Sequence, residues 1–239
     1  MSIGVYIAVF AVMVVASTVQ ASVGMGQGLL SAPLLRLLHP DLLPGPIVLC
    51  GLLTGVAVLL RDSQRTDVAE VVPAIAGRMV GTAIAIGMLA VLSERGLTLT
   101  IGTIVLVLVI LRVSGARIKK TPKTLGGAGV ASGIGGTIAA LGGAPIGLLY
   151  EQHARARDFR GPLAVFITAG GVIGVGSLAL AGEYNDGGWV LGMLLVPPIV
   201  IGWILARWVT PIVDRGLLGP AVLVMSAASA AVLILSEIF

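Results

Sequence analysis

The chain has 239 residues, of which 57% are hydrophobic and 11% charged, and its mean hydropathy is +1.08. A soluble domain of this size carries roughly 25% charged residues, so 15 basic and 11 acidic side chains are too few to cover a surface that faces water. The composition excludes a soluble enzyme and a nucleic-acid-binding domain as first interpretations. It indicates a polytopic α-helical membrane protein, whose net charge of +4 reflects loop orientation rather than an anionic partner.

Apolar runs recur along the whole chain, at about 3–22, 28–38, 44–60, 68–92, 97–112, 125–141, 143–150, 161–182, 189–208 and 217–236. No basic residues precede the first run, which favours a retained span over a cleaved signal peptide. The single cysteine, Cys50, excludes an intrachain disulfide and the cysteine pair of a thiol-redox carrier. Because His39 and His153 are too few and too isolated for a metal cluster, we expect no metal and no cofactor.

The segments between these runs differ in charge. Residues 112–123 hold five basic residues and no acidic one, which predicts a cytoplasmic loop by the positive-inside rule. Arginines also assign 61–67, 151–160 and the loop near residue 210 to the cytoplasmic side. Residues 183–188 contain Glu183 and Asp186 and no basic residue, which predicts the outer side.

This orientation requires the chain to enter the membrane after 112–123 and to return to the same side before 151–160. Residues 125–150 would form only about 39 Å of helix, too short for two crossings of a hydrocarbon core about 30 Å thick. The sequence Gly142-Gly143-Ala144-Pro145 predicts a break, because glycine and proline are poor helix formers. We therefore expect two short helices here, at least one of which does not span, that meet within the membrane. The first half is similar, with a run from Ile3, a break at 24–28 and a second arm, 28–38, that reaches only about 16 Å.

The two halves also repeat one another. Gly24 and Gly142 lie 118 positions apart, as do Pro44 and Pro162. The spacing predicts an all-α polytopic fold of two inverted-topology repeats, 1–116 and 117–239, each a broken or re-entrant helix hairpin followed by three transmembrane helices. Inverted repeats with interrupted helices at matching positions are typical of carriers that work by alternating access.

The glycine-rich break followed by Leu29-Leu30-Ser31-Ala32-Pro33, its partner Leu141-Gly142-Gly143-Ala144-Pro145 and the duplicated architecture resemble the sulfite exporter TauE/SafE family, also called the toluene sulfonate uptake permeases. The resemblance covers essentially the whole chain. It implies transport, usually export, of small organosulfur anions such as sulfite, sulfoacetate or related sulfonates across the bacterial inner membrane. The chain departs from the family pattern where Gln27 interrupts the glycine run and where Ala144 replaces a glycine.

The candidate substrate-binding residues lie at the two breaks and at one charge within a span. Helix starts expose unsatisfied N–H groups and the positive end of the helix dipole, which together bind anions. A purely structural kink packed by glycines is the alternative interpretation of the breaks. The candidates are Gln20, Gly24, Gly26, Gln27 and Gly28 at the first break, Gly142, Gly143, Ala144 and Pro145 at the second, and Arg78.

Arg78 lies about ten residues into the run 68–92. Ionisable groups inside the membrane are costly and mark functional pathways, and a guanidinium offers bidentate donors to a sulfonate. The alternative is that its long side chain reaches back to the cytoplasmic headgroups. Gln20, Ser22, Thr137 and Ser132 could bind a substrate or could satisfy the free carbonyls of broken helices.

No buried acid, histidine or nucleophile pair indicates an enzyme, so we expect no catalytic residue. Glu70, Glu151 and Asp158 are more typical of solvated span ends than of a proton relay. The competing interpretations are a passive anion channel, a carrier for a different small anion and a membrane scaffold. The expected partners are the anion, membrane lipid, a coupling proton or sodium ion, and a second copy bound through the Gly77-x3-Gly81 face, with no nucleic acid.

Overall fold

The structure, a computed structural model, describes residues 2–62, 68–115, 117–153, 156–185, 187–213 and 219–238. These residues form helices and connecting turns, with no strand among them. The helices are α1 (Ile3–Val23), α2 (Gln27–Leu38), η1 (Pro40–Leu42), α3 (Gly45–Asp62), α4 (Val68–Val91), α5 (Glu94–Val113), α6 (Pro122–Ala139), α7 (Gly143–Glu151), α8 (Ala156–Leu180), α9 (Gly188–Leu194), α10 (Val196–Val213) and α11 (Gly219–Ile238). Each predicted apolar run therefore corresponds to a helix or a helix pair.

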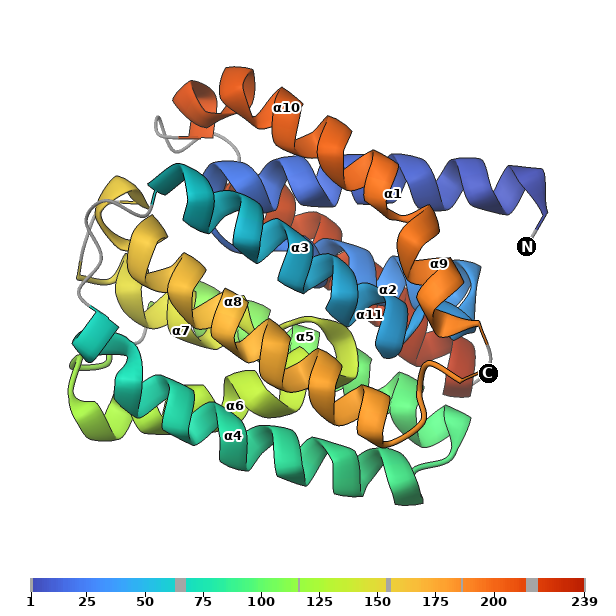
Figure 1. Cartoon of the computed structure of the whole chain (residues 1–239), viewed down its shortest axis with the longest axis horizontal. Helices are drawn as coiled ribbons and strands as arrows, with labels where there is room; N and C mark the ends of the chain where they lie inside the picture. Colours follow the sequence, from blue (N-terminus) through green and yellow to red (C-terminus); the bar gives the residue numbers. More distant parts are fainter. Residues whose placement is uncertain are drawn as a thin grey trace.

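The helices run roughly parallel or antiparallel along one axis of the molecule (Figure 1). Six helical segments in the described part of the chain are long and apolar enough to cross a membrane. Large apolar side chains such as Ile3, Val91 and Leu180 are more than four-fifths exposed, which fits a surface that faces lipid rather than water. The chain is a multi-pass membrane protein.

The helix ends place several basic and acidic residues at opposite ends of the molecule. The C-terminal ends of α3, α5, α7 and α10 lie at the left in Figure 1 and α1 begins at the right. Arg112, Arg117 and Lys120 belong to the left end, whereas Glu94 and Glu183 belong to the right end. The described helix ends that flank the predicted cytoplasmic segments thus lie at one end of the molecule.

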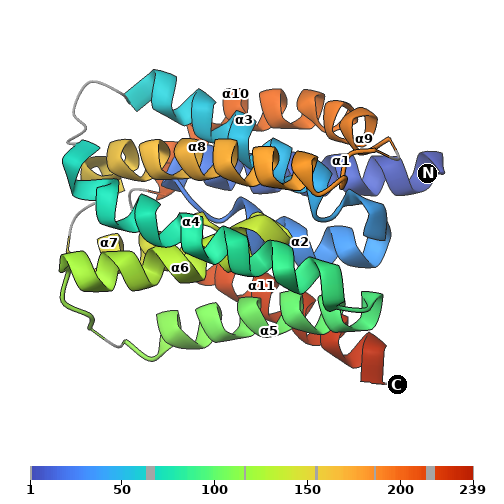
Figure 2. The ribbon, with the colours of Figure 1, turned by 60° about the horizontal axis from the view of Figure 1, so that its bottom comes forward.

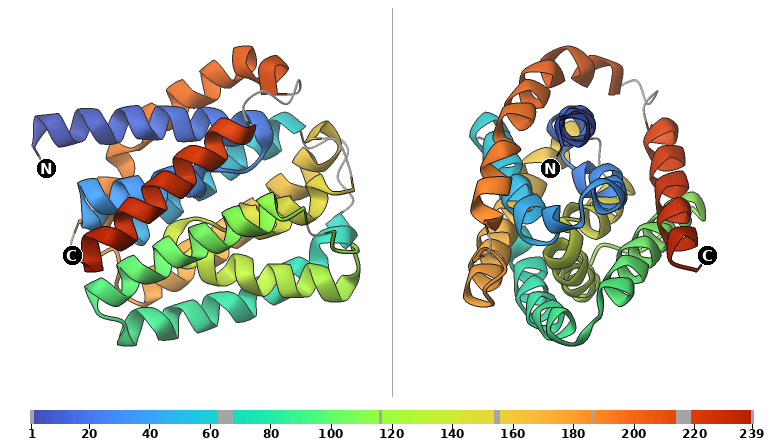
Figure 3. Two further views of the ribbon diagram at one scale, coloured as in Figure 1. Left: turned by 180° about the vertical axis from the view of Figure 1, so that it is seen from behind. Right: turned by 90° about the vertical axis from the view of Figure 1, so that its right-hand side faces the viewer.

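Two helix pairs turn back within the molecule. Both outer ends of the α1–α2 pair lie at the N-terminal end, and both outer ends of the α6–α7 pair lie at the opposite end (Figures 1 and 3). The first arms have about the lengths of the predicted runs 3–22 and 125–141: α1 has 21 residues and α6 has 18. The second arms are short, with 12 residues in α2 and 9 in α7.

Glycine faces pack helices from the two halves against one another. A methyl group built on Gly77 of α4 would lie 2.1 Å from the carbonyl oxygen of Gly126 in α6, and one on Gly81 would lie 2.1 Å from that of Val130. This face is therefore filled by α6 of the same chain and is not available to a second copy. Gly202 of α10 makes an equivalent approach to α1. Figure 2 shows α4 beside α6, and α5 beside α11.

Candidate substrate site

The two helix breaks meet each other at the centre of the molecule. A methyl group built on Gly28, in the first turn of α2, would lie 2.4 Å from the carbonyl oxygen of Ala140, where α6 ends. Only a residue without a side chain allows this approach of two backbones. The N-terminal ends of the short helices α2 and α7 are thereby brought to one place from opposite ends of the molecule.

Two glycines and one glutamine determine the backbone conformation of the first break. Gly24 and Gly26 have φ of 96° and 114°, a left-handed conformation that glycine adopts without steric cost. Gln20 Nε2 donates to the carbonyl oxygen of Gly24 at 3.2 Å, and the backbone N–H of Gln27 donates to Gln20 Oε1 at 3.1 Å. Gln20 thus satisfies groups that the break leaves free, which is the structural alternative considered for it.

The second break follows α6 directly. Ala140 has φ of 54°, and its N–H donates to the carbonyls of Gly135 and Gly136. The short helix α7 then begins at Gly143, and no side chain caps its start. At the start of α2, the N-cap residue Gly26 offers no side chain, and Gln20 Oε1 accepts only the N–H of Gln27. The two helix starts therefore direct their positive dipole ends, and the N–H groups that remain without a cap, at the space between the two breaks.

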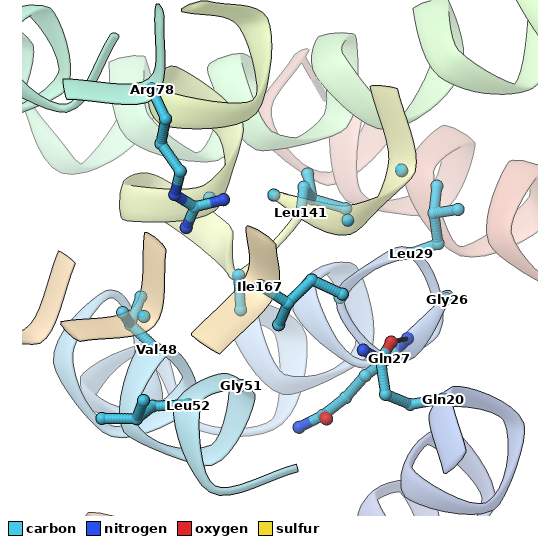
Figure 4. A pocket seen from close by; sticks show the side chains of 17 residues that line it. Gln20, Gly26, Gln27, Leu29, Val48, Gly51, Leu52, Arg78, Leu141 and Ile167 are labelled. Carbon is cyan, nitrogen blue, oxygen red and sulfur yellow. Dashed lines mark hydrogen bonds between the residues drawn. The ribbon is translucent and has the colours of Figure 1, made fainter. Parts of the chain in front are cut away.

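Arg78 extends from α4 into this space. Its side chain is 4% exposed, and Figure 4 shows the guanidinium directed toward Leu141 and Ile167 at the centre of the site. Among the residues that the structure describes, Arg78 Nε and Nη1 have no hydrogen-bond partner. The interpretation that Arg78 reaches back to the lipid headgroups is therefore wrong, because the side chain turns toward the interior.

Three glycines make room for the guanidinium. A methyl group built on Gly142 would lie 2.0 Å from Arg78 Nη1, one on Gly170 of α8 would lie 1.8 Å from Nε, and one on Gly136 of α6 would lie 2.7 Å from Nη2. The ring of Phe166 lies 5.3 Å from the guanidinium carbon, a distance at which an aromatic ring attracts a cation. The slot therefore fixes the direction of the charge.

Gln27 contributes a second polar group. Its side chain is 2% exposed and extends from the start of α2 toward Gly51 and Leu52 of α3 (Figure 4). Neither its Oε1 nor its Nε2 has a hydrogen-bond partner within the described part of the chain. Burying an amide without a partner is costly, so this amide is available to a bound molecule.

These groups surround a chamber of about 30 Å³, which is room for about two water molecules. Eight of the ten candidate residues line it. The lining consists of Gln20, Gly26, Gln27, Gly28, Leu29, Val48, Gly51, Leu52, Arg78, Gly136, Ala140, Leu141, Gly142, Gly143, Ala144, Ile167 and Gly171. Sequence reasoning missed the contributions of α3 and α8, for which the pair Gly170-Gly171 within an apolar run was the available signal.

Two candidates lie outside the chamber. Gly24 faces α8, where a methyl group would lie 3.5 Å from Arg160 Cγ. Pro145 lines a separate apolar groove of about 550 Å³ beside α5 and α6. Both residues shape the breaks without contacting the chamber.

The other polar candidates do not line the chamber, and among the described residues Ser22 Oγ and Ser132 Oγ have no hydrogen-bond partner. Thr137 Oγ1 lies 3.1 Å from Thr82 Oγ1 and joins α6 to α4. Glu70 pairs with Lys120, and Glu151 pairs with Arg112. The side chain of Asp158 lies outside the described residues.

The chain was compared with known proteins. The family model described as "Sulfite exporter TauE/SafE" matches residues 9–233. No curated protein and no solved structure matches the chain. Because the matched region covers nearly all of the 239 residues, the chain belongs to the sulfite exporter TauE/SafE family of membrane transporters.

Proposed function

We propose that the protein carries small sulfur-containing oxyanions, such as sulfite, sulfoacetate or other sulfonates, out of the cell, and that the chamber is its substrate site. The observation that carries this proposal is Arg78, a buried cation whose Nε and Nη1 lack partners among the described residues. Arginine keeps its charge in proteins, and its planar donors match the oxygens of an oxyanion. An arriving anion would compensate a buried charge that is costly to leave alone.

The surrounding groups have distinct roles in this proposal. The starts of α2 and α7 supply backbone N–H donors from opposite sides. Gln27 offers an amide that can donate to one anion oxygen, and Gln20 positions the first break through its two hydrogen bonds. The glycines around Arg78 fix the direction of its guanidinium, and their lack of side chains leaves room beside it for the anion.

Alternating access is the proposed mechanism. The chamber of about 30 Å³ is too small for an anion of four or more heavy atoms, so the surrounding helices must separate during transport. Two hairpins that enter from opposite ends, and the equivalent packing of α1 on α10 and of α4 on α6, support two inverted repeats over 1–116 and 117–239. Motion of one repeat against the other would expose the site to each side in turn.

Sulfite binding to the purified protein in detergent tests the substrate site. The Arg78→Gln variant removes the charge and keeps a polar side chain, and we expect its affinity to fall by at least roughly tenfold, since a hydrogen bond to a charged group contributes about 1.5–3 kcal/mol. The Arg78→Lys variant keeps the charge without the bidentate donors, so its sulfite affinity should lie between those of the parent protein and Arg78→Gln.

The matched control is Arg207→Gln, which removes an exposed arginine that stacks on Trp208 at 4.8 Å. This variant should bind sulfite as the parent protein does. Equal affinity of the parent and a folded Arg78→Gln protein would contradict the proposed site. Titrations with sulfoacetate, sulfate and thiosulfate under the same conditions would rank the substrates.

A further inference from the structure

A line of cavities leads from the chamber toward the end of the molecule that holds the basic segment 112–123. The chamber shares Leu29 and Ala144 with a small cavity between α2, α5 and α7, here called the neck. The neck in turn shares Arg112, Leu148 and Glu151 with a wider basin of about 540 Å³. Because neighbouring cavities have walls in common, they trace a route from the chamber to the surface, where Arg117 of the basin is exposed.

The neck is closed in this structure. Its volume of about 10 Å³ does not exceed what a single water molecule needs, roughly 10–15 Å³. Arg112 Nη2 donates to Glu151 Oε1 at 2.8 Å, and both side chains are about three-quarters buried. This ion pair joins α5 to the last residue of α7, so the route cannot widen at the neck while the pair keeps α7 against α5.

Arg112 is placed so that it can exchange the Glu151 carboxylate for a bound anion. Burial raises the pKa of the Glu151 carboxyl, and the charge of Arg112 opposes this rise. The carboxylate is thus less well stabilised by its surroundings than one in water, and the pair is only partly solvated. A sulfur oxyanion offers Arg112 the same kind of oxygen acceptors as a carboxylate.

The opposite end of α5 carries a similar ion pair. Arg36, near the end of α2, binds both the carboxylate and the carbonyl oxygen of Glu94 and also Thr98. Each short hairpin arm is therefore tied to one end of α5. Arg36 and Glu94 line neither the chamber, the neck nor the basin, so the cavities distinguish the two pairs.

We propose that the Arg112–Glu151 ion pair is the cytoplasmic gate of the anion route, and that Arg112 contacts the anion while the gate is open. The inference rests on the proposed function in taking the chamber as the substrate site. The gate separates when α7 moves away from α5, which joins chamber, neck and basin into one passage.

Labelling of a cysteine in the neck tests the gate. Cys50, the one cysteine of the sequence, is replaced by alanine, and Val109→Cys places a thiol in the neck, which Val109 lines. Inside-out membrane vesicles are treated with a membrane-impermeant maleimide without any transported anion. We expect Glu151→Gln and Arg112→Gln to raise the labelling rate roughly fivefold, the effect of losing an ion pair of about 1 kcal/mol.

The matched control is Glu94→Gln, which breaks the ion pair at the other end of α5 and should not raise the rate. The exchange of charges, Arg112→Glu together with Glu151→Arg, should restore slow labelling and also shows that the single variants do not act through misfolding. Unchanged labelling in both single variants, an equal rise in Glu94→Gln, or fast labelling after the charge exchange would overturn the gate. Since no anion is present, this result is independent of the sulfite titrations that test the substrate site.

Discussion

At the scale of single residues, the direction of the Arg78 side chain depends on glycines that carry no chemistry of their own. Gly170→Ala would place a methyl group 1.8 Å from Arg78 Nε, so the guanidinium must move out of its slot. The helix α8 itself tolerates alanine well. We therefore expect a folded protein whose sulfite affinity is lowered roughly tenfold, because the loss of aligned donors resembles the loss of a charged hydrogen bond.

Gly176→Ala is the matched control for this prediction. Gly176 lies in the same helix, and nothing lies within 4 Å of a methyl group built there. Isothermal titration of both variants with sulfite would separate the two outcomes. If the two alanine variants bound sulfite equally well, the slot would not position Arg78.

The site could be predicted from the sequence only where a residue contradicts its surroundings. Arg78 was recognisable because a charge inside an apolar run is costly, and the two breaks were recognisable because glycine and proline interrupt helices. Gly136 could not be singled out among 34 glycines, and the pair Gly170-Gly171 gives no indication of its partner, because the role of each glycine depends on which helix packs against it. The Arg112–Glu151 pair, separated by 39 positions, likewise exists only through tertiary packing.

At the scale of helices, the contact between the two breaks holds the hairpins together. Gly28→Ala would bring a methyl group to 2.4 Å from the carbonyl oxygen and 2.6 Å from the carbonyl carbon of Ala140. Backbone atoms cannot turn aside as a flexible side chain can, so the two hairpins must separate. We expect the variant to be destabilised by about 1–3 kcal/mol, the usual cost of overpacking, measured as a lower thermal unfolding temperature in detergent.

Gly87→Ala provides the comparison for Gly28→Ala, because Gly87 lies in α4 with open space around it. Alanine there should be neutral or slightly stabilising, since it favours the helix over the unfolded chain. If the Gly28→Ala protein were as stable as the Gly87→Ala protein, the contact between the two breaks would not contribute to stability.

The helices themselves were largely predictable, because each apolar run of the sequence became a helix or helix pair. The ends of the hairpin arms were less so, since packing decides where a helix stops: α6 continues through six glycines. α1 projects beyond its neighbours at the N-terminal end (Figures 1 and 3), whereas α2 and α7 end early. The interior glycine face of α4 also shows why a small-residue stripe does not reveal its partner: α6 of the same chain and a second copy would fit it by the same rule.

At the scale of the whole molecule, the route between the chamber and the basin is closed. The chamber of about 30 Å³ and the neck of about 10 Å³ leave no passage wide enough for a sulfur oxyanion between the site and the basin. A channel conducts through a passage that is continuous in its open state, whereas a carrier exposes its site to one side at a time. Under the proposed mechanism, this closed geometry corresponds to the state between the two open states of the carrier.

Counterflow in sealed vesicles measures this difference. Vesicles that contain the protein and are preloaded with unlabelled sulfite should take up radiolabelled sulfite faster than empty vesicles, and the uptake should saturate with concentration, because each return of a loaded carrier is an exchange. Vesicles with Arg78→Gln should show neither effect, since the buried charge that holds the anion is gone. Uptake that is unaffected by preloading, rises linearly with concentration and is accompanied by conductance would identify a channel instead, and the chamber would then be a constriction in a pore rather than a site exposed alternately to the two sides.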